Sequence, residues 1–274
     1  MKPIQNLHTH STYCDGADTP EQMIETALEK GFTSIGFSGH AYMPFSPAHT
    51  SYEKEEAYKK EIKRLKQVYE GRMDVFLGLE VEMYAPSDLS GFDYLIGSCH
   101  YFRFGDTMVA YDRSAEVVQK VIDDWFGGDG LAYAKAYYQN MMMLPERGDF
   151  DIIGHFDLIT KHSEKITLFD AECDEYKEYA VRALESLAGK IPYFEVNTGA
   201  MSRYGRTIPY PAPFLMREMK RLGFKPVISS DCHRREYLDF GFERAAQLLR
   251  ESGFTERYIL TKQGFVPVSL EDDE

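Results

Sequence analysis

The sequence predicts an α/β fold, a distorted (β/α)7 TIM-like barrel in one domain, from three observations. Short apolar runs typical of buried strands alternate with amphipathic helices seven times, and this alternation calls for a parallel sheet covered by helices. The length of 274 residues suits a single barrel domain. The chain has no Gly-x-Gly-x-x-Gly after the first strand and no Walker A motif, so a nucleotide-binding open sheet is less favoured. We expect the domain to span 1–270, with 271–274 as an acidic tail.

Each expected strand is a short apolar run, and several runs are followed at once by a histidine. We expect parallel strands at 3–7, 32–40, 74–82, 94–99, 150–154, 193–197 and 226–230. Strands are also expected at 258–260 and 265–268, as a closing pair. The segment 101–112 is expected to be a loop with room for a hairpin.

Helices are expected between these strands. The first has Thr19 as its N-cap, Pro20 at the first helical position and Gln22 completing a capping box, and it ends at Gly31. Further helices are predicted at 52–69, 114–125, 131–143, 170–187, 211–222 and 242–251. The segment that carries Arg203 and Arg206 is expected to be a loop.

Composition and charge exclude several classes of protein. Hydrophobic residues make up 43% of the chain, which is enough for a sizeable core. The net charge of −13 disfavours binding of long nucleic acid, although metals and arginines could still hold a small anion locally. No apolar run approaches the roughly twenty residues of a membrane span, and no signal-peptide pattern is found. The four cysteines form no Cys-x-x-Cys pair, so we expect reduced thiols and a cytoplasmic location. The oligomeric state is not predicted.

Histidines and carboxylates gather at the expected strand ends. His8 and His10 are two residues apart on an extended chain, so their side chains point to the same face. In a (β/α) barrel the functional residues lie at the C-terminal ends of the strands. The residues expected at or just after this edge are His8, His10, Asp15, His40, Glu80, His100, His155, Asp231 and His233.

This set of residues predicts a metal centre. Six of the eight histidines of the chain belong to it, and only His49 and His162 do not. One such histidine alone would more often be a capping or hydrogen-bonded residue. Six imidazoles and three carboxylates in one barrel mouth would be costly to bury unless cations neutralised and ordered them. Nine ligands are too many for one tetrahedral ion, so we expect two or three divalent ions, with Zn, Mn, Fe and Co all suitable. Glu80 is the most interior carboxylate and could bridge two of them.

Six segments in order resemble the motifs of the polymerase-and-histidinol-phosphatase (PHP) superfamily. They are His8-Thr9-His10-Ser11, Gly39-His40, Gly78-Leu79-Glu80, Ser98-Cys99-His100, Gly154-His155-Phe156-Asp157 and Ser230-Asp231-Cys232-His233. Asn197-Thr198-Gly199, with a basic residue shortly after it, resembles a segment of the histidinol-phosphate phosphatase branch. The resemblance extends over nearly the whole chain.

The resemblance implies a trinuclear metal site within the distorted barrel. His8, His10, Glu80 and Asp231 would hold the first ion. Glu80 would bridge to a second ion, which His100 and His155 would also hold. Asp15, His40 and His233 would hold the third ion. Some members of the superfamily have a histidine at the position of Asp15, so the identity and occupancy of the third ion stay open.

The resemblance also implies a reaction, the hydrolysis of L-histidinol phosphate to L-histidinol and phosphate, a step of histidine biosynthesis. A hydroxide bridging two metal ions would attack phosphorus in line, with Glu80, Asp231 and His233 as the catalytic residues. Arg203, Arg206 and Lys161 are candidates for binding the phosphate, because a cationic side chain suits its oxygens. The acid that protonates the leaving group is not assigned.

Two other functions remain open at this point. A PHP-type phosphodiesterase, exonuclease or nucleotide phosphatase would use the same ligands, but the acidic net charge and the lack of a basic tract count against a long oligonucleotide substrate. A metal-binding structural domain without turnover would be expected to have lost some ligands. All nine positions in this chain carry residues that can bind a metal, which favours an enzyme.

Overall fold

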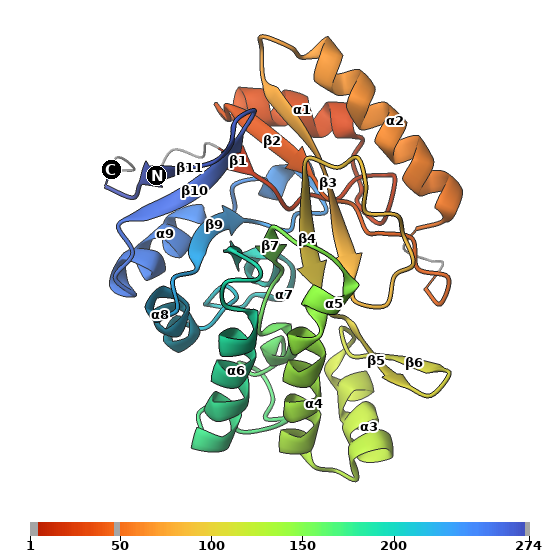
Figure 1. The fold of residues 1–274 in the computed structure, drawn as a ribbon, viewed down its shortest axis with the longest axis vertical. Coiled ribbons are helices and arrows are strands. Elements are labelled where there is room, and N and C mark those ends of the chain that lie inside the picture. Colours follow the sequence, from red (N-terminus) through yellow and green to blue (C-terminus); the bar gives the residue numbers. More distant parts are fainter. Residues whose placement is uncertain (1–4, 47–49, 272–274) are drawn as a thin grey trace.

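The chain folds into a nearly closed barrel of seven parallel strands surrounded by helices (Figure 1). The structure, a computed structural model, describes residues 5–46 and 50–271. The strand order is β1-β2-β3-β4-β7-β8-β9, so each parallel strand lies beside the next one in the chain. The ring closes where the amide of His10 donates to the carbonyl of Cys232 at 2.9 Å. The predicted fold class is confirmed.

The seven barrel strands have the predicted order but are mostly shorter than predicted. Their bounds are β1 (Gln5–Asn6), β2 (Ser34–Phe37), β3 (Asp74–Glu82), β4 (Tyr94–Ser98), β7 (Ile152–Ile153), β8 (Tyr193–Asn197) and β9 (Lys225–Ser229). After Asn6 the regular strand is interrupted, and the amide of His8 donates to the Asn6 side chain at 3.0 Å. The chain pairs again at Thr9, which forms a parallel bridge with Cys232. The predicted strand residues 3–4 and the tail residues 272–274 lie outside the described part of the chain.

Two antiparallel hairpins accompany the barrel. The segment after β4 forms one from β5 (Tyr101–Phe104) and β6 (Thr107–Ala110). The predicted closing pair forms the other, β10 (Glu256–Thr261) and β11 (Gly264–Ser269). The Gln5 side chain joins β1 to β10, since it donates to the Leu260 carbonyl and accepts from the Leu260 amide, both at 2.7 Å. This hairpin therefore lies against the N-terminal end of the barrel.

The helices follow the predicted pattern with two additions. Their bounds are α1 (Pro20–Glu29), α2 (Tyr52–Val68), α3 (Ala115–Phe126), α4 (Gly130–Met142), α5 (Leu144–Arg147), α6 (Asp174–Leu187), α7 (Gly199–Tyr204), α8 (Pro213–Arg221) and α9 (Phe242–Glu251). The capping box of α1 is present, with the Gln22 amide donating to Thr19 Oγ1 at 3.2 Å. The short helices α5 and α7 were not predicted, and α7 replaces part of the expected loop around Arg203.

Side-chain alternation along β3 divides the molecule into an outer and an inner core. Leu77, Leu79 and Val81 pack outward against the helices, so the residues between them point into the barrel. At the N-terminal end this interior holds a separate apolar cluster made of Leu7, Phe76, Tyr94, Ile96, Ile152, Val227 and Leu260. Gly78 leaves room for the Tyr94 ring, because a Cβ there would lie 2.2 Å from Tyr94 Cζ.

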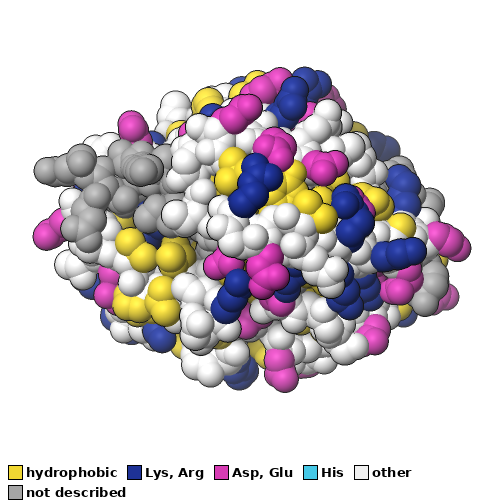
Figure 2. All heavy atoms as spheres, turned by 90° about the horizontal axis from the view of Figure 1, so that it is seen from above, with side chains coloured by type: hydrophobic (Ala, Val, Ile, Leu, Met, Phe, Trp, Pro, Cys, Tyr) yellow, Lys and Arg dark blue, Asp and Glu magenta, His cyan; other side chains and the backbone are white. Residues whose placement is uncertain are grey.

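The surface carries both signs of charge. On the face shown in Figure 2, lysines and arginines are interspersed with aspartates and glutamates. No helix in the described ranges has the length and apolar content needed to cross a membrane.

Candidate metal centre

All nine predicted ligands meet at the C-terminal end of the barrel, within three neighbouring groups. Within each group, one potential ligand atom per residue lies within 4.8 Å of the others. The groups are His8, His10 and Asp231; Glu80, His100 and His155; and His10, Asp15, His40 and His233. This partition matches the three ion positions that the PHP resemblance implies, except that Glu80 falls in one group only and His10 in two.

Glu80 lies at the centre of the three groups because β3 turns its side chain into the barrel. Its Oε1 is 3.0 Å from His155 Nε2 and 3.5 Å from His100 Nε2. Its Oε2 is 3.3 Å from His8 Nε2 and 2.9 Å from His40 Nδ1. The two oxygens thus face different groups, which is the placement needed for a carboxylate that bridges two ions. The bridging role itself stays a prediction.

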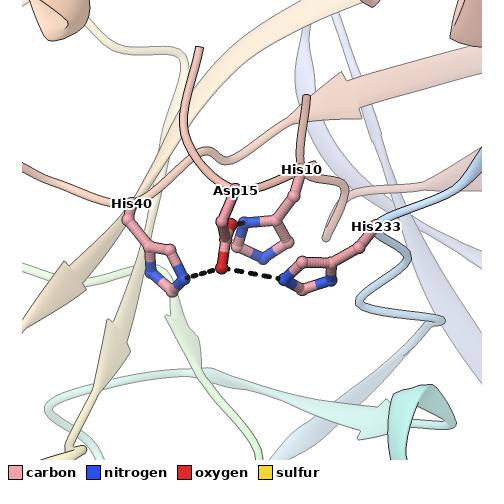
Figure 3. A group of neighbouring side chains, drawn as sticks. All are labelled: His10, Asp15, His40 and His233. Atoms are coloured by element: carbon pink, nitrogen blue, oxygen red, sulfur yellow. Dashed lines mark ion pairs between the residues drawn. The ribbon is translucent and has the colours of Figure 1, made fainter. Parts of the chain in front are cut away.

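Asp15 reaches the third group from the loop after β1 (Figure 3). Its carboxylate lies 3.4 Å from His10 Nδ1, 3.6 Å from His40 Nε2 and 3.3 Å from His233 Nε2. The loop folds back on itself because the Gly16 amide donates to the Ser11 carbonyl at 3.0 Å. A Cβ on Gly16 would lie 2.5 Å from the His10 backbone, so this return requires glycine.

Asp231 has an unusual backbone at the end of β9. Its φ of 45° lies in the left-handed region, where residues with a side chain are uncommon. This turn brings Asp231 Oδ1 to 3.2 Å from His10 Nε2, while Oδ2 accepts from Arg203 Nη2 at 2.7 Å. Strained residues of this kind cluster at functional sites, which agrees with the role predicted for Asp231.

Two further carboxylates, which were not predicted to belong to the site, contact imidazoles of the site at their Nδ1 atoms. Glu195 on β8 accepts from His8 Nδ1 at 2.8 Å, and Glu82 on β3 lies 3.0 Å from His100 Nδ1. Both carboxylates are buried. The signal in the sequence was a glutamate inside an otherwise apolar strand, since an unpaired buried carboxylate is too costly to occur without partners.

The electrostatics of the centre favour bound cations. Burial lowers the pKa of His8, but the carboxylates of Glu195, Asp231 and Glu80 outweigh it and raise that pKa to about 10. Burial raises the pKa of Glu80, yet the nearby imidazoles hold it well below its usual range. Burial, together with the charge of His10, lowers the pKa of His233 to about 4. The ionised carboxylates therefore stabilise positive charge in the site, whether protons or metal ions carry it.

The donor set fits divalent metal ions. The Nε2 atoms of His8 and His10 are buried and form no hydrogen bond to any described residue, although carboxylates lie nearby. A buried polar atom of this kind calls for an explanation, and an ion accepting the nitrogen lone pair supplies one. Imidazole nitrogens with carboxylate oxygens are the ligands of zinc, manganese, iron and cobalt sites. The cysteines near the site are buried and belong to none of the three groups.

A cavity of about 360 Å³ opens above the three groups. Arg203 lines it, with its guanidinium Nη1 3.0 Å from His233 Nδ1. The other two basic residues predicted to bind phosphate are not among the lining residues. Arg206 is buried, donates to the Thr160 carbonyl, and stacks 4.6 Å from the centre of the Tyr210 ring. Lys161 Nζ lies 2.5 Å from Asp112 Oδ1.

The three basic residues that were predicted to bind phosphate differ in their surroundings. Arg203 keeps its predicted position at the cavity. The guanidinium of Arg206 is occupied by backbone carbonyls, and the ammonium of Lys161 by a carboxylate, so the structure does not support direct phosphate contacts for them. Of the two histidines left out of the site, His162 bonds to the Arg113 carbonyl at 2.7 Å, and His49 lies outside the described residues.

The chain is similar to a known family. The family model described as "PHP domain" matches residues 6–199, well over half of the chain. This chain belongs to the PHP domain family. A relative from Deinococcus radiodurans, named "Probable histidinol-phosphatase", is 30% identical over 265 residues, which cover 92% of this chain and 95% of the relative.

Two crystal structures share the PHP fold of this chain. One, from Listeria monocytogenes, superposes with a TM-score of 0.76 at 18% identity and covers 88% of this chain and 99% of its own. The other is a histidinol phosphate phosphatase from Lactococcus lactis in complex with zinc, L-histidinol and phosphate. It superposes with a TM-score of 0.70 at 20% identity and covers 96% of this chain and 98% of its own. At these identities the likeness concerns the fold.

Proposed function

We propose that this chain is a metal-dependent phosphomonoesterase that hydrolyses L-histidinol phosphate to L-histidinol and phosphate. The observation that carries the proposal is the convergence of nine metal-binding side chains, in three adjoining groups, beneath a cavity that Arg203 lines. The substrate is inferred from the relatives, which cover nearly the whole chain and are named as histidinol-phosphatases. The cytoplasmic location stays part of this proposal.

The residues of the three groups would hold two or three divalent ions. Bound there, such ions would lower the pKa of water and neutralise the charge that develops on a phosphoryl group. Glu80 would hold two of them together, since its oxygens face different groups. The rings of His8 and His100 would keep their orientation when ions bind, because carboxylates already hold their Nδ1 atoms.

Arg203 would orient the phosphate. Its Nη2 is held by Asp231 at 2.7 Å, which fixes the plane of the guanidinium at the edge of the cavity. A fixed guanidinium can donate two parallel hydrogen bonds to phosphate oxygens with little loss of side-chain entropy. Because 31% of the Arg203 side chain is exposed, a ligand in the cavity could reach the guanidinium.

The proposal is tested by measuring bound metal and the release of phosphate by the same preparation. L-histidinol phosphate, nucleoside monophosphates and bis-p-nitrophenyl phosphate are compared as substrates for protein reconstituted with zinc, manganese, iron or cobalt. We expect histidinol phosphate to give the highest kcat/KM. Turnover of only the diester would establish a phosphodiesterase instead, and bound metal without turnover of any substrate would establish a structural metal domain.

A further inference from the structure

We propose that Glu195 is a positioning residue that holds one ligand from each of two ion groups, so that both ions depend on this carboxylate. Glu195 lies on β8, beneath the site, and does not belong to any of the three groups. Through His8 it acts on the group with His10 and Asp231. Through His155 it acts on the group with Glu80 and His100. The inference rests on the proposed metal centre and extends it by one residue.

The Glu195 carboxylate is fully enclosed and receives four hydrogen bonds. Oε2 accepts from His8 Nδ1 at 2.8 Å and from Ser229 Oγ at 2.6 Å. Oε1 accepts from the His155 backbone amide at 2.6 Å and from Asn197 Nδ2 at 2.8 Å. The side chain is 0% exposed, so these donors are its environment. An ionised carboxylate only accepts hydrogen bonds, so its two oxygens can satisfy all four donors.

The bond to Glu195 fixes the tautomer of His8. When Nδ1 carries the proton and donates it to Glu195, the lone pair of the neutral ring is on Nε2. His8 Nε2 faces the site, 3.3 Å from Glu80 and 3.8 Å from Asp231. The ring is therefore presented with its metal-binding nitrogen toward the other ligands.

Replacing the carboxylate with an amide conflicts with this arrangement. In Glu195→Gln one oxygen becomes an NH2 group, which must face two of the four donors. The His155 backbone amide cannot become an acceptor, whereas the His8 ring can change tautomer and the Ser229 hydroxyl can rotate. The NH2 group is thus expected to face His8, whose Nδ1 then accepts and whose Nε2 carries the proton. A protonated Nε2 cannot bind a metal ion.

Glu82 provides a matched comparison. Its Oε2 accepts from the His100 amide at 2.7 Å and lies 3.0 Å from His100 Nδ1. Its Oε1 has no hydrogen-bond partner among the described residues. Glu82→Gln can therefore keep an oxygen toward His100 and place its NH2 group at the unpartnered position. The same chemical change is then made beside a metal-site histidine without forcing its tautomer.

The experiment compares the wild type, Glu195→Gln, Glu195→Ala, Glu82→Gln and Ser229→Ala. Zinc binding is measured by competition with a chelating dye, and ions retained after dialysis are counted by mass spectrometry. We expect Glu195→Gln to weaken the ion of the His8 group by about 10–100-fold, in line with the usual effect of such outer partners. Glu195→Ala, which also removes the acceptor of the His155 amide, should weaken the ions of both groups. Glu82→Gln keeps its oxygen toward His100, so it should retain the ions of the wild type. Ser229→Ala removes a donor to Glu195 but leaves the His8 bond, so its ion count should match the wild type.

Histidine tautomers provide the readout that a purely structural role would not change. In proton–nitrogen spectra of selectively ¹⁵N-histidine-labelled, zinc-loaded wild type, His8 should carry its proton on Nδ1. In Glu195→Gln it should carry the proton on Nε2. Equal zinc binding by the wild type and Glu195→Gln overturns the inference. A wild-type His8 protonated on Nε2 also overturns it, and this measurement does not depend on the folding of any variant. A wild type that binds no ions at all instead contradicts the proposed function.

Discussion

The two ends of the barrel are built from the same strands but have opposite chemistry. At the N-terminal end, Phe76 of β3 joins Tyr94 and their neighbours in an apolar cluster closed by Leu260 of the β10–β11 hairpin. Four residues further along the same strand, Glu80 lies among imidazoles and carboxylates. Both side chains point into the barrel, and both are almost completely buried.

The difference shows which end supplies stability and which end supplies chemistry. Burial of apolar side chains at the N-terminal end is favourable in itself, at roughly 25 cal/mol per Å². Burial of ionised groups at the C-terminal end is unfavourable unless they are paired with opposite charge. Metal ions should therefore stabilise the C-terminal end, while the N-terminal end should not respond to them. The following predictions test this division.

The largest effect is expected from Glu80→Gln, which keeps the shape of the side chain and removes its charge. Loss of the central carboxylate should reduce the number of bound ions and lower kcat/KM for histidinol phosphate by about 10³-fold or more, since metal ions supply several kcal/mol of transition-state stabilisation. Metal analysis and phosphate release measure the two quantities. Glu61→Gln on α2, which pairs with Arg64 and belongs to none of the three groups, is the matched control. Full activity of the Glu80 variant would contradict the central role of this residue.

At the opposite end, Phe76→Ala should act on stability alone. Removing the buried ring leaves a cavity in the apolar cluster and should lower the free energy of unfolding by about 3–5 kcal/mol. Urea unfolding measures this change. The number of ions bound per folded molecule should stay as in the wild type, and a loss of ions would mean that the two ends are coupled.

Removal of the metal ions should destabilise the protein and stop phosphate release. A ligand that binds only the folded state at 100 times its Kd adds about 2.7 kcal/mol, and this contribution is lost on chelation. Thermal unfolding with and without a chelator measures the shift in Tm, and added zinc or manganese should reverse it. An unchanged Tm would show that the buried charges of the C-terminal end need no ions.

The smallest effect is expected from Arg203→Ala at the rim of the cavity. Loss of a charged hydrogen-bond donor to phosphate costs about 1.5–3 kcal/mol, so KM for histidinol phosphate should rise by roughly 10–150-fold. Steady-state kinetics measures KM and kcat separately. Arg64→Ala, which removes an exposed arginine of α2, is the control. An unchanged KM and kcat would exclude Arg203 from phosphate binding.

The choice among the three predicted basic residues shows where sequence patterns stop being informative. Arg203, Arg206 and Lys161 are all cations close to a motif, and nothing in their spacing distinguishes them. The unpredicted helix α7 directs Arg203 toward Asp231, while the guanidinium of Arg206 is occupied by the Thr160 carbonyl. Which partner each long side chain meets depends on segments more than 25 residues away in sequence.

The sequence by itself determined the strand order and the residues at the strand ends. Alternation of buried strands and helices reflects local periodicity, and barrel topology then places every strand end at one edge. This is why His8, His155 and Asp231 could be assigned together although they lie far apart in the chain.

Only the tertiary structure decided which residues hold the predicted metal ligands in place. The four donors that meet at Glu195 come from β8, β9 and the segments that follow β1 and β7, and no local pattern encodes their convergence. The same holds for Tyr94, whose ring crosses the barrel interior over Gly78. Contacts of this kind depend on strand register and barrel closure, which arise from the packing of the whole chain.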